Sequence, residues 1–328
     1  VHRIAPLGAP VHATVRVPGS KSIANRALVC AALADGASEL VGLPDGDDTR
    51  AMVEGLRALG VEIETVEVQE DGAGGLLASV TGGRGALRRG PVTVNAGLAG
   101  TTSRFLTAMA ALAPGPCTID GAPPLRTRPM GPLHDALRSL GVRVAASSEH
   151  GHLPVVVQGP PAHDIGEVSL PGDVSSQFLS ALMMIAPLLP NGLRVRLTTR
   201  LVSRPYIRIT ASVMQSFGIE GIELGDRIIS VPAGSYRARS YAIEPDASSA
   251  SYPLAVAAIC GGAVRVEGLT ERSVQGDASF CRVLERMGCE VLQDERGTIV
   301  RRTSPLRGIG IDMADISDLV PTLAVVAA

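Results

Sequence analysis

Hydrophobic and polar positions along the chain follow a pattern that predicts alternating strands and helices. Apolar and polar residues alternate over 11–17 (VHATVRV), which predicts a strand that Pro18-Gly19 ends. Residues 23–33 are apolar on nearly every side of a helix, so we expect this helix to be buried. Asp35-Gly36 then predicts the end of the helix.

The same pattern returns along the rest of the chain. A short strand, a Ser/Thr cluster and a long apolar helix recur at intervals of about 70–80 residues, at 92–112, 168–189, 241–260 and 311–328. The first four copies also carry an amphipathic helix that closes with a turn and a strand, at 49–62, 132–144, 206–219 and 278–291. The sequence therefore predicts an α/β fold built from one repeated module. Because the fifth copy stops inside its first helix, we expect part of the fold to be missing at the C-terminal side.

The start of the first apolar helix carries cations where the helix dipole disfavours them. Ser20 or Ser22 can cap this helix, and Lys21 and Arg26 lie in its first turn or just beyond. Ser22 and Arg26 are four residues apart and therefore share one face. We expect Lys21, Ser22, Arg26 and the free backbone N–H groups to converge on an anion. The alternative is a capped helix with a solvent-exposed lysine and arginine.

Other helix starts along the chain share this chemistry. Polar and basic residues stand at the expected starts of four further helices, at Thr101 and Arg104, at Ser175, Ser176 and Gln177, at Arg126 and Arg128, and at Ser203 and Arg204. Several such starts in one repeated architecture indicate an anionic ligand with more than one phosphate or carboxylate. The alternative for each single arginine is a solvated charge.

Composition narrows the class of protein. The chain has 328 residues, 45% of them hydrophobic and 2% aromatic, so we expect about two domains with aliphatic cores. The net charge of −2 gives no case for nucleic acid or an anionic membrane as partner. Five scattered cysteines form no CxxC pair, which fits a reduced cytoplasm and no metal site. No apolar run has the length of a membrane span, and no signal peptide opens the chain.

The motifs as a set resemble one family, the 5-enolpyruvylshikimate-3-phosphate synthases, over essentially the whole chain. The matching stretches are PGSKSIANRAL, GLAGTTSRF, RTRPMGPLHDALRSLGV, SSQFLSALMM, LVSRPYI and DASSASY. The resemblance implies a two-domain enolpyruvyl transferase fold, an inside-out α/β barrel built from six βαβαββ units, with helix starts directed into a cleft. It also implies an upper domain at 21–240 and a lower domain at 1–20 plus 241–328, incomplete at its C-terminus.

The resemblance implies a reaction and its site. The family transfers the enolpyruvyl group of phosphoenolpyruvate to the 5-hydroxyl of shikimate 3-phosphate, in aromatic amino acid biosynthesis, and is the target of glyphosate. The resemblance implies no cofactor or metal. It also implies that the protein is a monomer in the cytoplasm. The residues that match shikimate 3-phosphate contacts are Ser22, Arg26, Ser175, Ser176, Gln177, Ser203, Tyr206 and Asp318. Those that match phosphoenolpyruvate contacts are Lys21, Gly100, Arg128 and Gln177. Asp318 is the candidate base, and Lys21 is the candidate acid or stabiliser of departing phosphate.

The chain departs from the family pattern at two places, and two other functions stay open. Leu98 stands where the family often has Asn, and Phe105 where Pro is common. The family's catalytic glutamate and further Arg and Lys ligands would follow Asp318, so we expect this chain alone to be inactive.

One alternative function is that of a UDP-N-acetylglucosamine enolpyruvyl transferase, although that family has Lys-Asn where Lys21-Ser22 stands and a cysteine near 126–128. The other is a truncated, non-catalytic copy that binds phosphorylated ligands.

Overall fold

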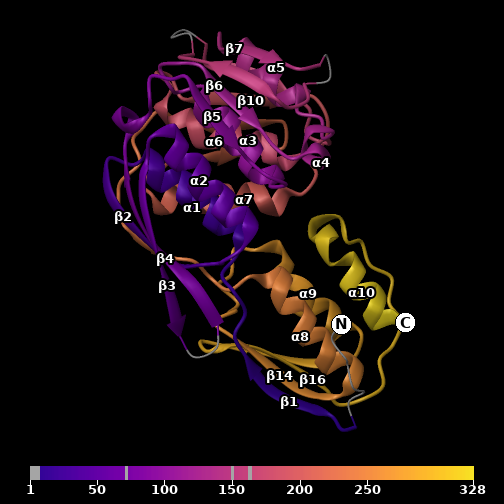
Figure 1. The fold of residues 1–328 in the computed structure, drawn as a ribbon. Coiled ribbons are helices and arrows are strands. Elements are labelled where there is room, and N and C mark those ends of the chain that lie inside the picture. Colours follow the sequence, from indigo (N-terminus) through magenta and orange to yellow (C-terminus); the bar gives the residue numbers. More distant parts are fainter. Residues whose placement is uncertain (1–7, 71–72, 149–150, 162–164) are drawn as a thin grey trace. The chain divides into compact units, whose positions relative to one another are not determined.

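The computed structural model describes residues 8–70, 73–148, 151–161 and 165–328. The chain divides into two compact units (Figure 1). The large unit comprises Lys21–Val68 and Gly75–Ile243, and the small unit comprises Val1–Ser20, Gln69–Gly74 and Glu244–Ala328. The assignment of 21–240 and of both chain ends to two family domains stays a prediction.

Four four-stranded sheets share one strand order within the described residues. Counted across each sheet, the first two strands are parallel, and the second strand pairs antiparallel with the third. Two sheets of the large unit are β5 (Val92–Asn95), β6 (Cys117–Asp120), β8 (Val155–Gln158), β7 (Arg143–Ala146), and β9 (Glu167–Leu170), β10 (Leu193–Leu197), β12 (Ile228–Val231), β11 (Glu223–Leu224). This common order agrees with the repeated module expected from the sequence.

The remaining two sheets each take their first strand from a distant part of the chain. In the large unit the order is β13 (Ser240–Ala242), β2 (Gly36–Leu43), β4 (Ala73–Gly82) and β3 (Glu62–Glu70). In the small unit it is β1 (Val11–Val15), β14 (Gly262–Glu267), β16 (Gly297–Arg302) and β15 (Cys289–Asp294). β1 leads into a helix of the large unit but pairs with β14, and β13 leads into a helix of the small unit but pairs with β2.

Three helices form the interior of the large unit, and almost every residue in them is buried. They are α1 (Lys21–Leu33), α3 (Gly100–Ala110) and α6 (Ser176–Ile185), which confirms the buried helices expected from the sequence. More amphipathic helices pack against them: α2 (Asp47–Leu59), α5 (Gly131–Ser139) and α7 (Arg204–Ser216). Figure 1 shows α1, α2, α3, α6 and α7 grouped together in this unit. Short helices complete it: α4 (Pro123–Arg126), η1 (Arg84–Ala86) and η2 (Ala186–Leu188).

The small unit contains one further repeat and a last helical segment. α8 (Ala247–Cys260) packs on β14 and β16, and α9 (Phe280–Arg286) follows η3 (Gly276–Ser279). The expectation of a strand and a buried helix at 311–328 is wrong. This stretch forms η4 (Ala314–Leu319) and α10 (Val320–Ala327), and α10 buries only Thr322 and Val326. None of the described helices combines the length and apolar character that crossing a membrane requires.

The end of β4 lies against the end of α1, and this contact leaves no room for a side chain at Gly82. A Cβ at Gly82 would lie 2.3 Å from the carbonyl oxygen of Ala31 and 2.6 Å from that of Ala32. We expect Gly82→Ala to lower the free energy of unfolding by about 1–3 kcal/mol, because backbone atoms must move apart. Gly85→Ala, where a Cβ meets nothing within 4 Å, should change it by less than about 0.5 kcal/mol. Equal urea midpoints for the two variants would contradict this.

His134 of α5 predicts a pH dependence of stability. Its side chain is fully buried, and neither ring nitrogen has a hydrogen-bond partner among the described residues. Burial, with a smaller effect of Arg138, lowers the pKa of His134 from 6.5 to about 4. Because the unfolded chain binds this proton first, stability present above pH 6.5 is lost as the pH falls toward 4. We expect the free energy of unfolding of His134→Leu, measured in urea, to fall by about 2 kcal/mol less than that of wild type between pH 6.5 and 4. Parallel plots of this free energy against pH for the two proteins would contradict the assignment.

Candidate functional site

Arg26 lies in the interior of the large unit, among four helices. Its guanidinium donates to the hydroxyl of Thr210 on α7 (2.7 Å), to the hydroxyl of Ser180 on α6 (3.2 Å), and to the backbone carbonyls of Ser22 (2.7 Å) and Tyr206 (3.4 Å). The residue is only 2% exposed. The alternative of a solvent-exposed arginine is therefore wrong at this position.

All acceptors that the structure gives Arg26 are neutral. No carboxylate pairs with it among the described residues, and burial lowers its pKa from 12.5 to about 10. An unneutralised buried cation favours an anionic ligand, because a phosphate or carboxylate forms charge-assisted hydrogen bonds with a guanidinium. The position of Arg26 thus supports an anion site, while its side chain points into the helix core rather than along the surface of α1.

Lys21, the first residue of α1, differs from Arg26 because it remains about half exposed. Its ammonium forms an ion pair with Asp48, the second residue of α2, over 2.9 Å. The hydroxyl of Ser20 does not cap α1: it is fully buried and has no hydrogen-bond partner among the described residues. The backbone N–H of Ser20 instead donates to the carbonyl of Glu244 (2.8 Å), so the expected Ser20 cap is wrong.

A second cationic group surrounds the start of α3. Nη1 of Arg104 donates to the carbonyl of Gly100 (2.8 Å). A Cβ placed on Gly100 would lie 2.6 Å from Nη1 of Arg104 and 2.9 Å from Nη1 of Arg128. The absent side chain of Gly100 therefore lets two guanidinium groups approach the first turn of α3, where backbone N–H groups already favour an anion.

The charge on Arg104 is incompletely compensated. Arg104 is 7% exposed, and its Nε has no hydrogen-bond partner among the described residues. Burial, and then the nearby charge of Arg128, lowers the pKa of Arg104 from 12.5 to about 10. An anion between the guanidinium groups of Arg104 and Arg128 offsets their mutual repulsion and offers an acceptor to the buried Nε of Arg104.

The starts of α6 and α7 supply neutral polar groups. Ser175 caps α6 by accepting from the backbone N–H of Gln177 (3.3 Å), and the Gln177 amide donates to the hydroxyl of Thr101 on α3 (3.3 Å). Ser176 is 7% exposed. Ser203 precedes α7 with a left-handed backbone (φ 53°), and its carbonyl accepts from the N–H of Tyr206 (3.1 Å). Gln177 thus connects the starts of α6 and α3.

Two arginines at expected helix starts form ion pairs with aspartates. Arg126 forms a two-point ion pair with Asp120 (2.7 and 2.8 Å), and Arg204 pairs with Asp226. Both side chains are partly exposed. Arg126 and Arg204 are therefore better described as solvated surface charges. In the segment 126–128 it is Arg128, not Arg126, that approaches Gly100.

Asp318 belongs to the small unit, where it lies in η4 and is exposed. Acidic groups surround the start of α8: Asp246 caps it by accepting from the N–H of Ser249 (2.7 Å), and Asp277 accepts from the hydroxyl of Ser248. Burial, together with the charges of Asp318 and Asp246, raises the pKa of Asp277. Among the described residues, no group of three or more His, Cys, Asp or Glu side chains is arranged to hold a metal ion.

Sequence reasoning missed the residues that hold the cations in place. Asp48, Ser180 and Thr210 contact Lys21 or Arg26 from other helices. Their only signal in the sequence is the repeat, since Ser180 follows Phe178-Leu179 as Thr107 follows Phe105-Leu106. Arg104 was recognised as basic but was not assigned to either ligand.

Comparisons with known proteins cover almost the whole chain. The family model described as EPSP synthase (3-phosphoshikimate 1-carboxyvinyltransferase) matches residues 7–328. A 3-phosphoshikimate 1-carboxyvinyltransferase of Trichormus variabilis is 40% identical over 99% of this chain and 75% of its own length. One of Methanoculleus marisnigri is 40% identical over 97% and 74%. The chain thus spans about three quarters of these relatives.

Solved structures agree on the fold. A structure of EPSP synthase from Acinetobacter baumannii matches with a TM-score of 0.80 and 24% identity, over 98% of this chain and 72% of that one. A second structure of EPSP synthase from the same organism gives a TM-score of 0.78 and 23% identity. These matches account for nearly all of the present chain. They do not support the expectation that a C-terminal part is missing or that the chain alone is inactive.

The environment of Arg26 predicts a large cost for removing one acceptor. Thr210→Val keeps the shape of the buried side chain but leaves Nε of Arg26 without its partner. We expect the free energy of unfolding to fall by about 1–3 kcal/mol, because a buried charged donor is left unsatisfied. Thr93→Val, at an exposed position of β5, is the matched control and should change it by less than about 0.5 kcal/mol. Equal effects in urea unfolding would show that Thr210 is not needed by Arg26.

Proposed function

The chain belongs to the EPSP synthase (3-phosphoshikimate 1-carboxyvinyltransferase) family, and we propose that it uses the cationic helix starts of the large unit to bind shikimate 3-phosphate and phosphoenolpyruvate. It transfers the enolpyruvyl group of phosphoenolpyruvate to the 5-hydroxyl of shikimate 3-phosphate and releases phosphate. The observation that carries this assignment is the pair of buried guanidinium groups, Arg26 and Arg104, each without a carboxylate partner among the described residues. Two such groups on adjacent helices suit two anionic substrates.

Shikimate 3-phosphate binds at the starts of α1, α6 and α7. Arg26 supplies the buried positive charge, and the carbonyls of Ser22 and Tyr206 accept from it. Neutral polar groups at the starts of α6 and α7 come from Ser175, Ser176, Gln177, Ser203 and Tyr206. Helix N-termini present unpaired backbone N–H groups that accommodate phosphate oxygens. This arrangement favours a phosphorylated polyol, because it combines cationic and neutral hydrogen-bonding groups.

Phosphoenolpyruvate binds at the start of α3. Gly100 permits close backbone approach, and Arg104 and Arg128 supply positive charge beside it. Lys21 adds a half-exposed ammonium that is paired with Asp48, and Gln177 lies between the two substrates. Arg104 is thereby added to Lys21, Gly100, Arg128 and Gln177, which the family resemblance already implied.

The chemistry requires one proton to leave the hydroxyl and one to reach C3 of phosphoenolpyruvate. The 5-oxygen bonds to C2 of phosphoenolpyruvate while C3 takes a proton, which gives a tetrahedral intermediate. That intermediate then loses a proton from C3 and expels phosphate, so that the enol ether forms. Asp318 accepts the hydroxyl proton, and Lys21 donates a proton or stabilises the departing phosphate. No cofactor takes part in this scheme, and a monomer in the cytoplasm stays a prediction from the resemblance.

Simple assays distinguish the proposed reaction from the two alternative functions. UDP-N-acetylglucosamine as acceptor tests the sibling enolpyruvyl transferase, which the comparisons do not favour. Binding of both substrates without phosphate release by the 328-residue chain would favour a non-catalytic copy, or the expectation that further catalytic residues are needed. Phosphate release that depends on both substrates would support the proposed reaction and exclude inactivity of this chain alone.

Asp318 provides the test of acid–base chemistry. We expect Asp318→Asn to lower kcat by about 100-fold or more, because the amide cannot accept the hydroxyl proton. The Kd for shikimate 3-phosphate should change far less. Asp315→Asn, three residues earlier and also exposed, is the control and should leave kcat unchanged. Equal effects of the two substitutions, in an assay of phosphate release, would remove Asp318 from the mechanism.

Gly100 provides the test of the phosphoenolpyruvate position. We expect Gly100→Ala to raise the KM for phosphoenolpyruvate about 10-fold or more, because a Cβ would displace the two guanidinium groups. The Kd for shikimate 3-phosphate should stay within about twofold of wild type. A larger change for shikimate 3-phosphate than for phosphoenolpyruvate would contradict the placement of the two substrates.

A further inference from the structure

The two buried arginines occupy equivalent places in the first two repeats. Nη1 of Arg26 donates to the carbonyl of Ser22, and Nη1 of Arg104 donates to the carbonyl of Gly100, four residues earlier in each case. In the third repeat the equivalent position is Gln177, since Gln177 and Arg104 are both followed by Phe-Leu. The large unit therefore repeats one local device at the starts of α1 and α3.

Each arginine also lies over a phenylalanine ring from the next repeat. Cζ of Arg26 is 5.2 Å from the ring centroid of Phe105 on α3, and Cζ of Arg104 is 5.6 Å from that of Phe178 on α6. Both rings are 1% exposed, so water does not weaken these contacts. Distances within about 6 Å are in the range of cation–π attraction, which grows when the pair is desolvated. Arg26 has a second, longer contact with the ring of Tyr206 at 6.0 Å.

The rings matter because no carboxylate pairs with either arginine among the described residues. Within that part of the chain, Arg104 donates to the carbonyl of Gly100 and its Nε is unsatisfied. The ring of Phe178 is therefore the main contact on the face of this guanidinium. Arg26 has four neutral acceptors, and Phe105 closes one side of it. Removing a ring takes away the contact that closes one side of the corresponding guanidinium, and so weakens the preference for its present geometry.

We infer that Phe105 and Phe178 are positioning residues that act on different substrates. Phe105 orients Arg26 for shikimate 3-phosphate, and Phe178 orients Arg104 beside Gly100 and Arg128 for phosphoenolpyruvate. The inference rests on the proposed function.

The test compares Phe105→Leu and Phe178→Leu, which remove the ring and keep an apolar side chain. Calorimetric titration gives the Kd for shikimate 3-phosphate. The affinity for phosphoenolpyruvate is measured at saturating shikimate 3-phosphate, as a KM where phosphate is released and as a Kd otherwise. We expect Phe105→Leu to weaken shikimate 3-phosphate roughly 3- to 30-fold with a smaller effect on phosphoenolpyruvate, and Phe178→Leu to do the reverse.

Phe217→Leu is the matched control. Phe217 is fully buried in the same core, and its ring packs against that of Tyr241 rather than against a cation among the described residues. A merely structural effect of losing a buried ring would lower stability in all three variants without separating the two substrates. Phe105→Met and Phe178→Met, which have flexible apolar side chains, replace the leucine variants if these do not fold.

The outcomes distinguish this inference from the function on which it rests. Opposite changes for the two substrates support it. Equal changes for both substrates, or changes no larger than those of Phe217→Leu, overturn it while the proposed function stands. A folded wild-type chain that binds neither substrate overturns the proposed function, and the inference falls with it.

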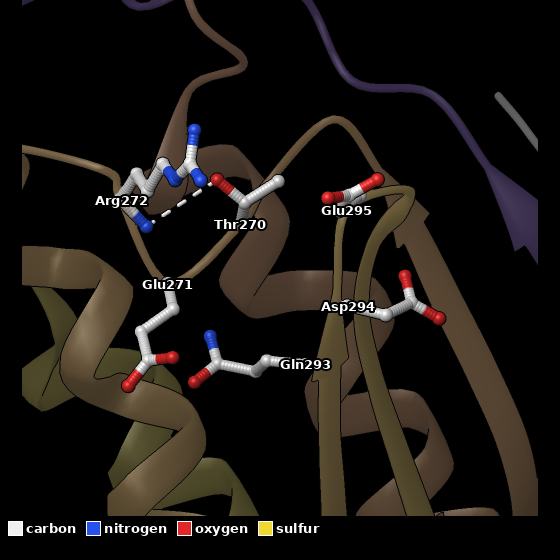
Figure 2. A pocket seen from close by; sticks show the side chains of 6 residues that line it. All are labelled: Thr270, Glu271, Arg272, Gln293, Asp294 and Glu295. Carbon is white, nitrogen blue, oxygen red and sulfur yellow. Dashed lines mark hydrogen bonds between the residues drawn. The ribbon is translucent and has the colours of Figure 1, made fainter.

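A cavity of the small unit carries no comparable inference. It has a volume of about 530 Å³ and is lined by Thr270, Glu271, Arg272, Gln293, Asp294 and Glu295 (Figure 2). Asp294 is fully engaged as part of a hairpin turn, because it accepts from Arg265 and from the backbone N–H groups of Arg296 and Gly297. The remaining side chains are of mixed charge and do not define a ligand.

Discussion

The large unit depends on burying two guanidinium groups, those of Arg26 and Arg104, inside a helical core where no carboxylate of the described residues neutralises either. Desolvating a charge is costly, and proteins usually offset it with an opposite charge. Here carbonyl oxygens, hydroxyl groups and aromatic rings surround Arg26, while Arg104 keeps an unsatisfied Nε. The core therefore holds positive potential that an anion can complete. This requirement links the packing of the helices to the binding of phosphorylated substrates.

The repeated module is what brings these groups together. In the large unit each copy pairs a sheet with a nearly fully buried helix, and a hydrogen bond from Gln177 to Thr101 connects the starts of two of these helices. Small residues such as Gly100 let charged side chains approach the backbone at these turns. Variation at one repeated position then supplies different chemistry: arginine in the first two copies and glutamine in the third. One fold element thus yields both cationic and neutral contacts.

Much of this architecture was predictable from the sequence, because apolar helices such as 23–33 and amphipathic ones such as 206–219 follow from periodicity. The stretch at 311 was not, since residues 311–313 form no strand and the 3₁₀ segment η4 follows them at Ala314–Leu319. The burial of Arg26 was also missed, because a charged residue near a helix start is usually solvated. Its partners Ser180 and Thr210 are 154 and 184 residues away in the chain. Such tertiary contacts leave no local signal in the residues around Arg26.

The central claim is that the buried cations of the large unit form a substrate anion site, and ligand-linked unfolding tests it most directly. Urea unfolding would be measured with and without shikimate 3-phosphate for the wild type and for Arg26→Gln, which removes the charge. A ligand at about 100 times its Kd should stabilise the wild type by about 2.7 kcal/mol, and the same concentration should stabilise Arg26→Gln much less. Equal stabilisation of both proteins would contradict the account, because the substrate would then bind without the buried charge.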